Sequence, residues 1–189
     1  MTNSGPGPTD ELLVMQAQDG DAEAMEALVR RWQRRLWTHA YRLTARSEAA
    51  WDITQQSWLA IIKGLGRLQD PARFKTWAYR IVANKAIDHL KVQAAAAAGA
   101  DAVDEPRPPR QENRAILRDL LRRLEPDKQA LLVLYYFEGL TVSEIGVVIG
   151  IPPGTVKSRL HASRAELKRL WERTAAESGD ERRRHPEDH

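Results

Sequence analysis

Apolar residues recur three or four positions apart over most of the chain, which is the spacing of one face of an α-helix. The longest such stretch runs from Ala22 to about Ala45, and its arginines fall on other faces. No stretch shows the alternation expected of a β-strand. Helical spacing returns in further segments, at about residues 47–62, 73–91, 111–124, 126–137, 141–150 and 153–170. The pattern therefore predicts an all-α protein.

Capping residues mark several of the expected helix starts. Thr9 or Asp10 can cap a short helix, which Gly20 would end. Asp21 can then cap the long helix, and Ser47 can cap the helix after it.

The apolar pattern stops after the fourth helix. Five consecutive alanines at 94–98 allow that helix to continue, but the following GADAVDEPRPPR has three prolines and no apolar period. Such a composition is typical of an exposed linker. We therefore expect two small helical domains joined by a flexible linker. The expected boundaries are 9–92 for the first domain, 93–111 for the linker, 112–173 for the second domain and 174–189 for a disordered tail.

The stretch 141–170 predicts two helices joined by a tight turn. Thr141 and Glu144 have the spacing of a capping box. Gly150 can end the first helix, because glycine enters the left-handed cap conformation without steric cost. Pro153 suits the first position of a new helix.

The second of these helices combines an apolar face with a basic one. Residues 152–170 contain five Lys or Arg and one Glu, a net charge of +4. Two short helices of which the second is basic and carries hydroxyls describe a helix-turn-helix that enters the major groove. A helical hairpin with a solvated charged face is the alternative, but cap, turn and basic face fall in register. The residues expected on the DNA-facing side are Thr155, Lys157, Ser158, Arg159, His161 and Arg164.

The whole chain is only mildly basic, with a formal net charge of +3 over 189 residues, so any nucleic-acid surface must be local. The absence of cysteine excludes disulfides, thiolate catalysis and Cys-ligated zinc. No apolar run is long enough to span a membrane, and the first ten residues do not form a signal peptide, so a cytoplasmic protein is expected. The five histidines do not cluster with carboxylates, and no nucleophile has an adjacent base. We expect no enzyme, no metal and no cofactor.

The fourth helix of the first domain is expected to present a mixed surface. Phe74, Trp77, Ile81 and Val82 can form its core face. Aromatic residues interleaved with basic ones suit unpaired bases, because rings stack and cations meet phosphate. The remaining surface is expected to comprise Lys75, Thr76, Tyr79, Arg80, Asn84 and Lys85.

The third helix is expected to present a different kind of face. Asp52, Gln55 and Gln56 are polar but carry little net charge. This suits a protein contact better than a DNA contact, because phosphate repels a carboxylate. The expected core residues of this helix are Ile53, Trp58, Ile61 and Ile62.

Three blocks of the sequence carry a family resemblance, and they occur in the order AAWDITQQSW, FKTWAYRIVANKAIDHLK and EGLTVSEIGVVIGIPPGTVKSRLHASR. Together they resemble the extracytoplasmic-function sigma factors of the bacterial sigma-70 superfamily. The match as a whole covers about residues 9–171. The resemblance implies a protein that binds core RNA polymerase and directs it to promoter DNA, with only the second and fourth sigma domains. Family members are often held inactive by an anti-sigma factor packed between or around the two domains, which a flexible linker would permit.

The resemblance also implies roles for individual residues. Asp52, Gln55 and Gln56 match the helix that binds the clamp of core polymerase, although the family usually has Glu in place of Gln56. The loop 68–73 matches the loop that captures a base flipped from the −10 element, so that recognition is coupled to melting. The −10 DNA-binding residues so implied are Leu68, Arg73, Trp77, Tyr79, Arg80 and Asn84. The basic helix of the second domain matches the helix that reads the −35 element.

Two other classes of protein remain alternatives. The first is a stand-alone helix-turn-helix repressor or activator that reads duplex operators without polymerase. That alternative gives no role to Asp52, Gln55, Tyr79 or Asn84. The second is a helical adaptor with an incidental basic surface, which leaves the capped, basic helix unexplained.

Overall fold

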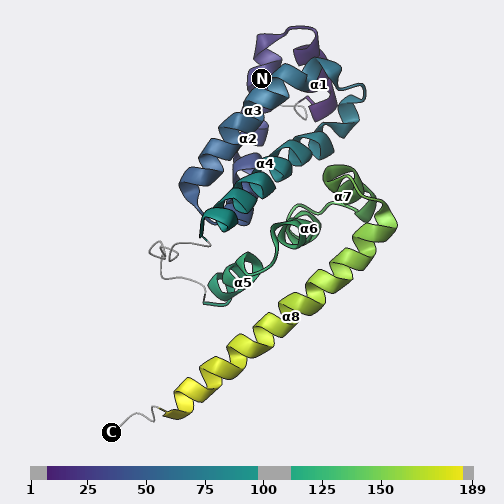
Figure 1. Cartoon of the computed structure of the whole chain (residues 1–189). Helices are drawn as coiled ribbons and strands as arrows, with labels where there is room; N and C mark the ends of the chain where they lie inside the picture. The colour runs from purple at the N-terminus through teal and green to yellow at the C-terminus, as the bar shows by residue number, and fades with distance from the viewer. Residues whose placement is uncertain (1–7, 98–111, 185–189) are drawn as a thin grey trace, which may run out of the picture.

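The computed structural model describes residues 8–97 and 112–184, with side chains for 8–95 and 116–174. The described residues contain no strand, and their helices form two groups (Figure 1). The first group consists of α1 (Asp10–Gln18), α2 (Ala22–Thr44), α3 (Ser47–Gly64), two short 3-10 helices η1 (Leu65–Arg67) and η2 (Pro71–Arg73), and α4 (Phe74–Ala97). The second consists of α5 (Glu112–Arg122), α6 (Pro126–Tyr136), α7 (Val142–Ile149) and α8 (Pro153–Arg184). The prediction of an all-α protein with two helical groups is confirmed.

Most of the predicted helix starts are confirmed by their hydrogen bonds. The Thr9 hydroxyl accepts from the backbone N–H of Leu12 at 3.3 Å, and the Asp21 carboxylate accepts from the first turn of α2. One start differs from the prediction, because Arg46 precedes α3 and Ser47 is its first residue. The Arg46 side chain makes no capping hydrogen bond, so the N-terminus of α3 relies on packing rather than on a polar cap.

Two helices run further than the sequence suggested. Because alanine is the strongest helix former, α4 continues to Ala97, into the segment predicted to be linker. The rest of that predicted linker, 98–111, lies outside the described residues. The prediction of disorder from residue 174 is wrong as far as Arg184, since α8 continues to that residue. No proline interrupts this stretch before Pro186, and its Ala, Glu and Arg residues favour a helix.

A continuous apolar core runs through both helical groups. In the first group, Trp32 and Leu36 of α2 are buried against Phe74 and Val82 of α4, with the Trp32 and Phe74 rings edge to face at 5.4 Å. In the second, α6 is buried between α7 and α8. The two groups also pack on each other, because α4 lies against α6 and α7 and α2 lies against α5 and α6 (Figure 1).

Candidate functional site

The turn between α7 and α8 has the geometry that the sequence predicted. Thr141 and Glu144 form a reciprocal capping box, and the backbone N–H of Thr141 donates to the Glu144 carboxylate at 2.7 Å. This hydrogen bond is the main reason why the pKa of the Glu144 carboxyl is lowered from its ordinary value. Gly150 is left-handed, with φ of 78°. At Gly146, which the sequence did not single out, an added Cβ would lie 2.8 Å from the carbonyl oxygen of Ile151. The two helices therefore meet closely only because position 146 lacks a side chain.

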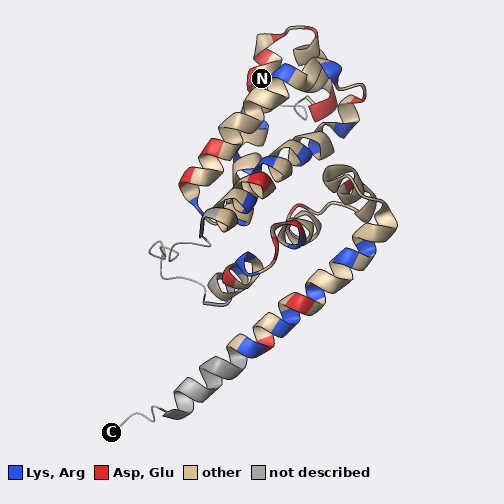
Figure 2. Cartoon of the chain, viewed as in Figure 1, with Lys and Arg blue, Asp and Glu red and all other residues tan. Residues whose placement is uncertain are grey.

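The first turns of α8 separate an inner from an outer face. Val156, Leu160 and Ser163 are buried against the domain. Thr155 is half-buried, and its carbonyl accepts from the Ser158 hydroxyl at 3.0 Å. The other residues predicted to face duplex DNA all lie exposed on the outer side: Lys157, Ser158, Arg159, His161 and Arg164. Lys and Arg recur along the described part of this helix (Figure 2).

Arg164 differs from its neighbours, because two aromatic rings hold its guanidinium. The guanidinium carbon lies 5.3 Å from the ring centre of Tyr135 and 5.5 Å from that of Tyr136. Such cation–π contacts contribute about 0.5–1 kcal/mol each at exposed sites. They restrict the rotamers of Arg164 and so favour one direction for its charge.

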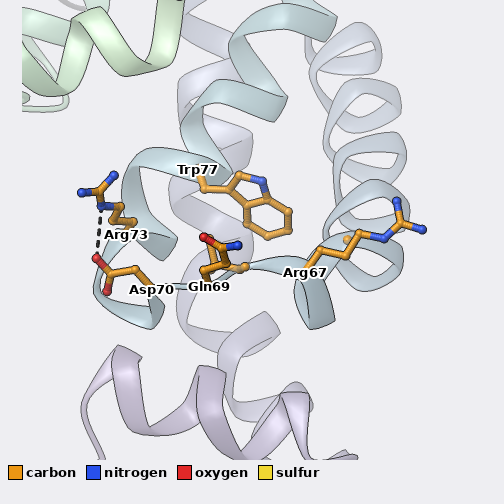
Figure 3. Close-up of a pocket in the computed structure, with 7 residues that line it drawn as sticks. Arg67, Gln69, Asp70, Arg73 and Trp77 are labelled. Carbon is orange, nitrogen blue, oxygen red and sulfur yellow. Dashed lines mark hydrogen bonds and ion pairs between the residues drawn. The ribbon is translucent and has the colours of Figure 1, made fainter.

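The loop between α3 and α4 forms a hollow of about 470 Å³. Its lining residues are Gly64, Arg67, Leu68, Gln69, Asp70, Arg73 and Trp77. The half-buried Trp77 indole lies above Gln69, with Arg67 and Arg73 on opposite sides (Figure 3). Trp77 packs against the core with part of its ring, as its apolar spacing predicted, and also forms a wall of this hollow. An added Cβ at Gly64 would lie 3.0 Å from the Trp77 ring, so this glycine sets the position of the indole.

Side chains around the hollow hold its loop in place. The Gln18 side-chain amide of α1 donates to the carbonyl oxygens of Leu65 at 2.9 Å and Leu68 at 2.8 Å. Asp70 caps η2 through the backbone N–H of Ala72 and forms an exposed ion pair with Arg73 at 3.1 Å. An exposed ion pair contributes little to stability, so Arg73 can exchange this partner for another anion. The role of Gln18 depends on a contact with a loop 47 residues away, and no local pattern indicated it.

The remaining predicted residues of α4 divide into two sets. Arg80 and Asn84 are exposed, as expected. Tyr79 was predicted to lie on the surface, but only 4% of it is exposed. Thr76 is buried as well. The Tyr79 ring packs edge to face on Trp32 and His39 of α2, and the second helical group lies against α4 as well. The sequence could not place one group on the other.

One carboxylate of the second group contacts three hydrogen-bond donors of the first group. Glu138, between α6 and α7, accepts from the Tyr79 hydroxyl at 2.7 Å, Arg42 at 2.7 Å and His39 Nδ1 at 3.1 Å. His39 Nδ1 must carry its proton here, because a carboxylate only accepts. The sequence did not indicate this contact between His39 and a single carboxylate. His39 and Glu138 are 99 residues apart in the sequence. Among the described residues, no group of three or more His, Cys, Asp or Glu side chains could hold a metal ion.

The protonation states of this cluster follow from its surroundings. Burial alone would raise the pKa of Glu138, but the hydrogen bond and charge of His39, with help from Tyr79 and Arg42, lower it to about 2. Burial and the neighbouring Glu138 carboxylate raise the pKa of Tyr79 far above its ordinary value. Near neutral pH, Glu138 is therefore an anion and the Tyr79 hydroxyl is a donor.

The predicted polymerase-binding residues lie on the outer side of α3. Asp52, Gln55 and Gln56 are all exposed. Leu59 and Ile62 follow on the same side and are 59% and 51% exposed, although Ile62 was expected in the core. An exposed apolar pair beside three polar residues is a composition suited to a protein contact. Among the described helices none is long and apolar enough to cross a membrane.

These features define a class of DNA-binding protein: a helix-turn-helix domain attached to a second helical domain with an aromatic, arginine-flanked hollow. Residues 28–96 match the family described as Sigma-70 region 2, and residues 114–167 match Sigma-70, region 4. The chain belongs to the extracytoplasmic-function sigma factors of the sigma-70 family, which are transcription initiation factors of RNA polymerase.

Individual relatives agree with this assignment. The chain is 32% identical to the RNA polymerase sigma factor CarQ of Myxococcus xanthus, over 81% of this chain and 92% of the relative. It is 34% identical to the ECF RNA polymerase sigma factor SigM of Mycobacterium tuberculosis, over 80% and 79%. The fold resembles that of CnrH, solved in complex with the cytosolic domain of CnrY, with a TM-score of 0.65, 24% identity and coverage of 86% and 97%.

Proposed function

We propose that the two helical groups read two parts of one promoter in different states. Residues 9–92 bind core polymerase and an unpaired −10 strand, whereas residues 112–173 bind the closed −35 duplex, with 93–111 as the connection. The observation that carries the proposal is the contrast between two surfaces. The outer face of α8 carries exposed cations and hydroxyls suited to a groove, whereas the hollow beside α4 has a half-buried indole suited to an extruded base.

In the proposed mechanism, the second domain positions the protein first. Lys157, Arg159 and Arg164 meet the duplex, and each good bidentate base contact contributes about 1–3 kcal/mol. A base of the −10 element then leaves the stack and enters the hollow against Trp77, while Arg80 and Asn84 hold the strand. Extruding a base costs a few kcal/mol, least at weakly stacked steps. Because these contacts form only after opening, they favour the melted state.

The outer face of α3 is the proposed contact with core polymerase. Asp52, Gln55 and Gln56 supply polar contacts, and Leu59 supplies apolar area next to them. A protein that acts with polymerase would act in the cytoplasm. The sigma factor RpoE of Bartonella quintana, which has this fold, was solved in complex with the anti-sigma factor NepR, so an anti-sigma partner is part of the proposal.

The test compares two variants in the assembled complex with core polymerase. Asn84→Ala should leave −35 duplex binding intact yet reduce permanganate reactivity of the −10 thymines. Lys157→Ala should weaken duplex binding in a mobility-shift assay. Normal promoter opening by Asn84→Ala would contradict the role in strand capture. Full duplex affinity of Lys157→Ala would contradict the role of α8.

A stand-alone operator-binding protein is the competing function. It shares the helix-turn-helix but has no use for the outer face of α3. Asp52→Ala should reduce co-purification with core polymerase, and full retention would remove this face from the interface.

A further inference from the structure

The strongest feature that the proposed function leaves unexplained is the position of Glu138. Its side chain is only 6% exposed and ends among three donors of the first domain. One carboxylate oxygen accepts from His39 and Arg42, and the other accepts from Tyr79. The donors come from two helices, α2 and α4, so the first domain forms a ready-made anion site that the second domain fills.

More arginines line the approach to this anion site. Successive turns of α2 contribute to a shallow hollow of about 390 Å³ that ends at Glu138, lined by Arg30, Arg31, Arg34, Arg35, Thr38 and Arg42. Arg30 pairs with Glu26 and Arg31 pairs with Asp10. Arg34 and Arg35 are exposed, and the Arg35 guanidinium lies 5.2 Å from the centre of the Trp32 ring. Among the described residues, Glu138 is the one acidic residue that lines this hollow, and it comes from the other domain.

Glu138 also contacts Tyr79, which the family resemblance implies as a −10 DNA-binding residue. The Tyr79 ring packs edge to face on Trp32 and His39 of the first domain, and its hydroxyl donates to Glu138 of the second. While that hydrogen bond lasts, the hydroxyl cannot meet a DNA strand. The residues predicted to read −35 duplex remain exposed in the same structure. The closed chain thus presents one DNA surface and hides part of the other.

We propose that the anion site formed by His39, Arg42 and Tyr79, with Arg34 and Arg35 at its rim, binds a backbone phosphate of the −10 single strand, and that Glu138 occupies it in the closed chain. The carboxylate offers these donors the same anionic oxygens that a phosphodiester offers. The inference rests on the proposed function for the choice of strand. The closed chain would then inhibit its own binding of the −10 strand, because the strand must displace Glu138 and separate the two domains.

Other contacts hold the domains together as well. The Gln129 side chain donates to the carbonyl oxygen of Leu43 at 2.9 Å, and Lys91 pairs with Asp127 at 3.3 Å. Losing the Glu138 carboxylate would leave the buried His39 and Tyr79 and the partly exposed Arg42 without their anionic partner, which shifts such an equilibrium by about 100-fold or more. Opening is therefore expected in a Glu138 variant even though Gln129 and Lys91 keep their partners.

The experiment measures binding of a labelled oligo(dT) to the full chain by fluorescence anisotropy. Glu138→Gln should bind the oligonucleotide at least about tenfold more tightly than wild type, because the competing anion is gone. Glu166→Gln is the matched control, since Glu166 forms a 2.7 Å ion pair with Lys128 inside the second domain. Equal affinity of Glu138→Gln and wild type would overturn the proposal.

The rim is tested in the Glu138→Gln background. Adding Arg34→Ala and Arg35→Ala should return the affinity toward the wild-type value and reduce the salt slope by about 0.7 per lost phosphate contact. An unchanged slope would overturn the phosphate site. Complete displacement of the oligonucleotide by millimolar inorganic phosphate would identify a small-anion site instead and would also overturn it.

The Asn84→Ala change separates this inference from the proposed function. If Asn84→Ala has no effect on promoter opening while the arginine changes weaken binding of the strand, the proposed base capture fails and the phosphate site stands. If Asn84→Ala impairs opening while Glu138→Gln changes nothing, base capture stands and the inference fails.

A second measurement needs no change at Glu138. The chain has no cysteine, so spin labels can be placed at Gln33→Cys in α2 and Val147→Cys in α7, both exposed positions. Saturating oligo(dT) should lengthen and broaden the distance distribution, because binding and opening are thermodynamically linked. An unchanged distribution with bound oligonucleotide would contradict opening, even if Glu138→Gln failed to fold.

Discussion

Replacing Gly146 with alanine should destabilise the second domain and weaken its binding to duplex DNA. The new Cβ would lie 2.8 Å from the carbonyl oxygen of Ile151 and 3.7 Å from the backbone nitrogen of Pro153. Backbone atoms cannot rotate away, so α7 and the start of α8 must move apart. Such overpacking costs about 1–3 kcal/mol. Alanine gains about 1 kcal/mol of helix propensity over glycine, so a net loss of up to about 2 kcal/mol is expected.

Gly154→Ala is the matched control for this change. Gly154 also lies in a helix of the same motif, but nothing stands within 4 Å of the position its Cβ would take. That variant should be neutral or more stable by up to about 1 kcal/mol. Urea unfolding gives both stabilities, and a mobility shift on −35 duplex gives both affinities. Equal stability of the two variants would refute the close approach at Gly146.

Three further predictions concern the other surfaces. The double change Leu59→Ser and Ile62→Ser should weaken binding to core polymerase about tenfold or more. Stability should be nearly unchanged, because both side chains are exposed. The control is Leu12→Ser on α1, which also removes an exposed leucine and should leave polymerase binding normal. Gly64→Ala should displace the Trp77 indole and lower the affinity for a −10 single strand, while the affinity for −35 duplex stays the same. The control is Gly66→Ala, which has open space around its Cβ position and should leave both affinities unchanged. The pKa of Glu138 is lowered from 4.5 to about 2, so ionised Glu138 stabilises the fold by an amount on the order of 3 kcal/mol. This contribution is complete above about pH 5.5 and is lost as the pH falls from about 4.5 toward 2. Urea unfolding should therefore show a larger loss between pH 6 and pH 3 for wild type than for Glu138→Gln, and parallel losses would contradict the buried pair.

Local chemistry explains what the sequence predicted well. The Thr141–Glu144 box, the left-handed Gly150 and the first-turn Pro153 each depend on residues a few positions apart, and the structure has all three. The outer face of α8 followed from the same periodicity. Here the backbone alone decides which side chains point outward.

Contacts between distant segments explain what the sequence did not predict. Tyr79 was expected on the surface of α4, but its ring packs on Trp32 and His39 of α2 and its hydroxyl meets Glu138 of the second domain. Glu138 also reaches His39 across 99 residues. Ile62 has core spacing in α3, yet it is 51% exposed, because α3 turns this side away from the core. The tail after residue 174 lacks an apolar stripe but keeps strong helix formers, and propensity outweighed the missing pattern.

The central claim is that this chain opens a promoter together with core RNA polymerase rather than binding duplex DNA alone. Permanganate reactivity of the −10 thymines on a linear promoter tests it directly. We expect reactivity only when core enzyme and chain are both present, with loss of reactivity in Asn84→Ala. A chain that binds its duplex site tightly, yet neither joins core enzyme nor changes thymine reactivity, would contradict the account.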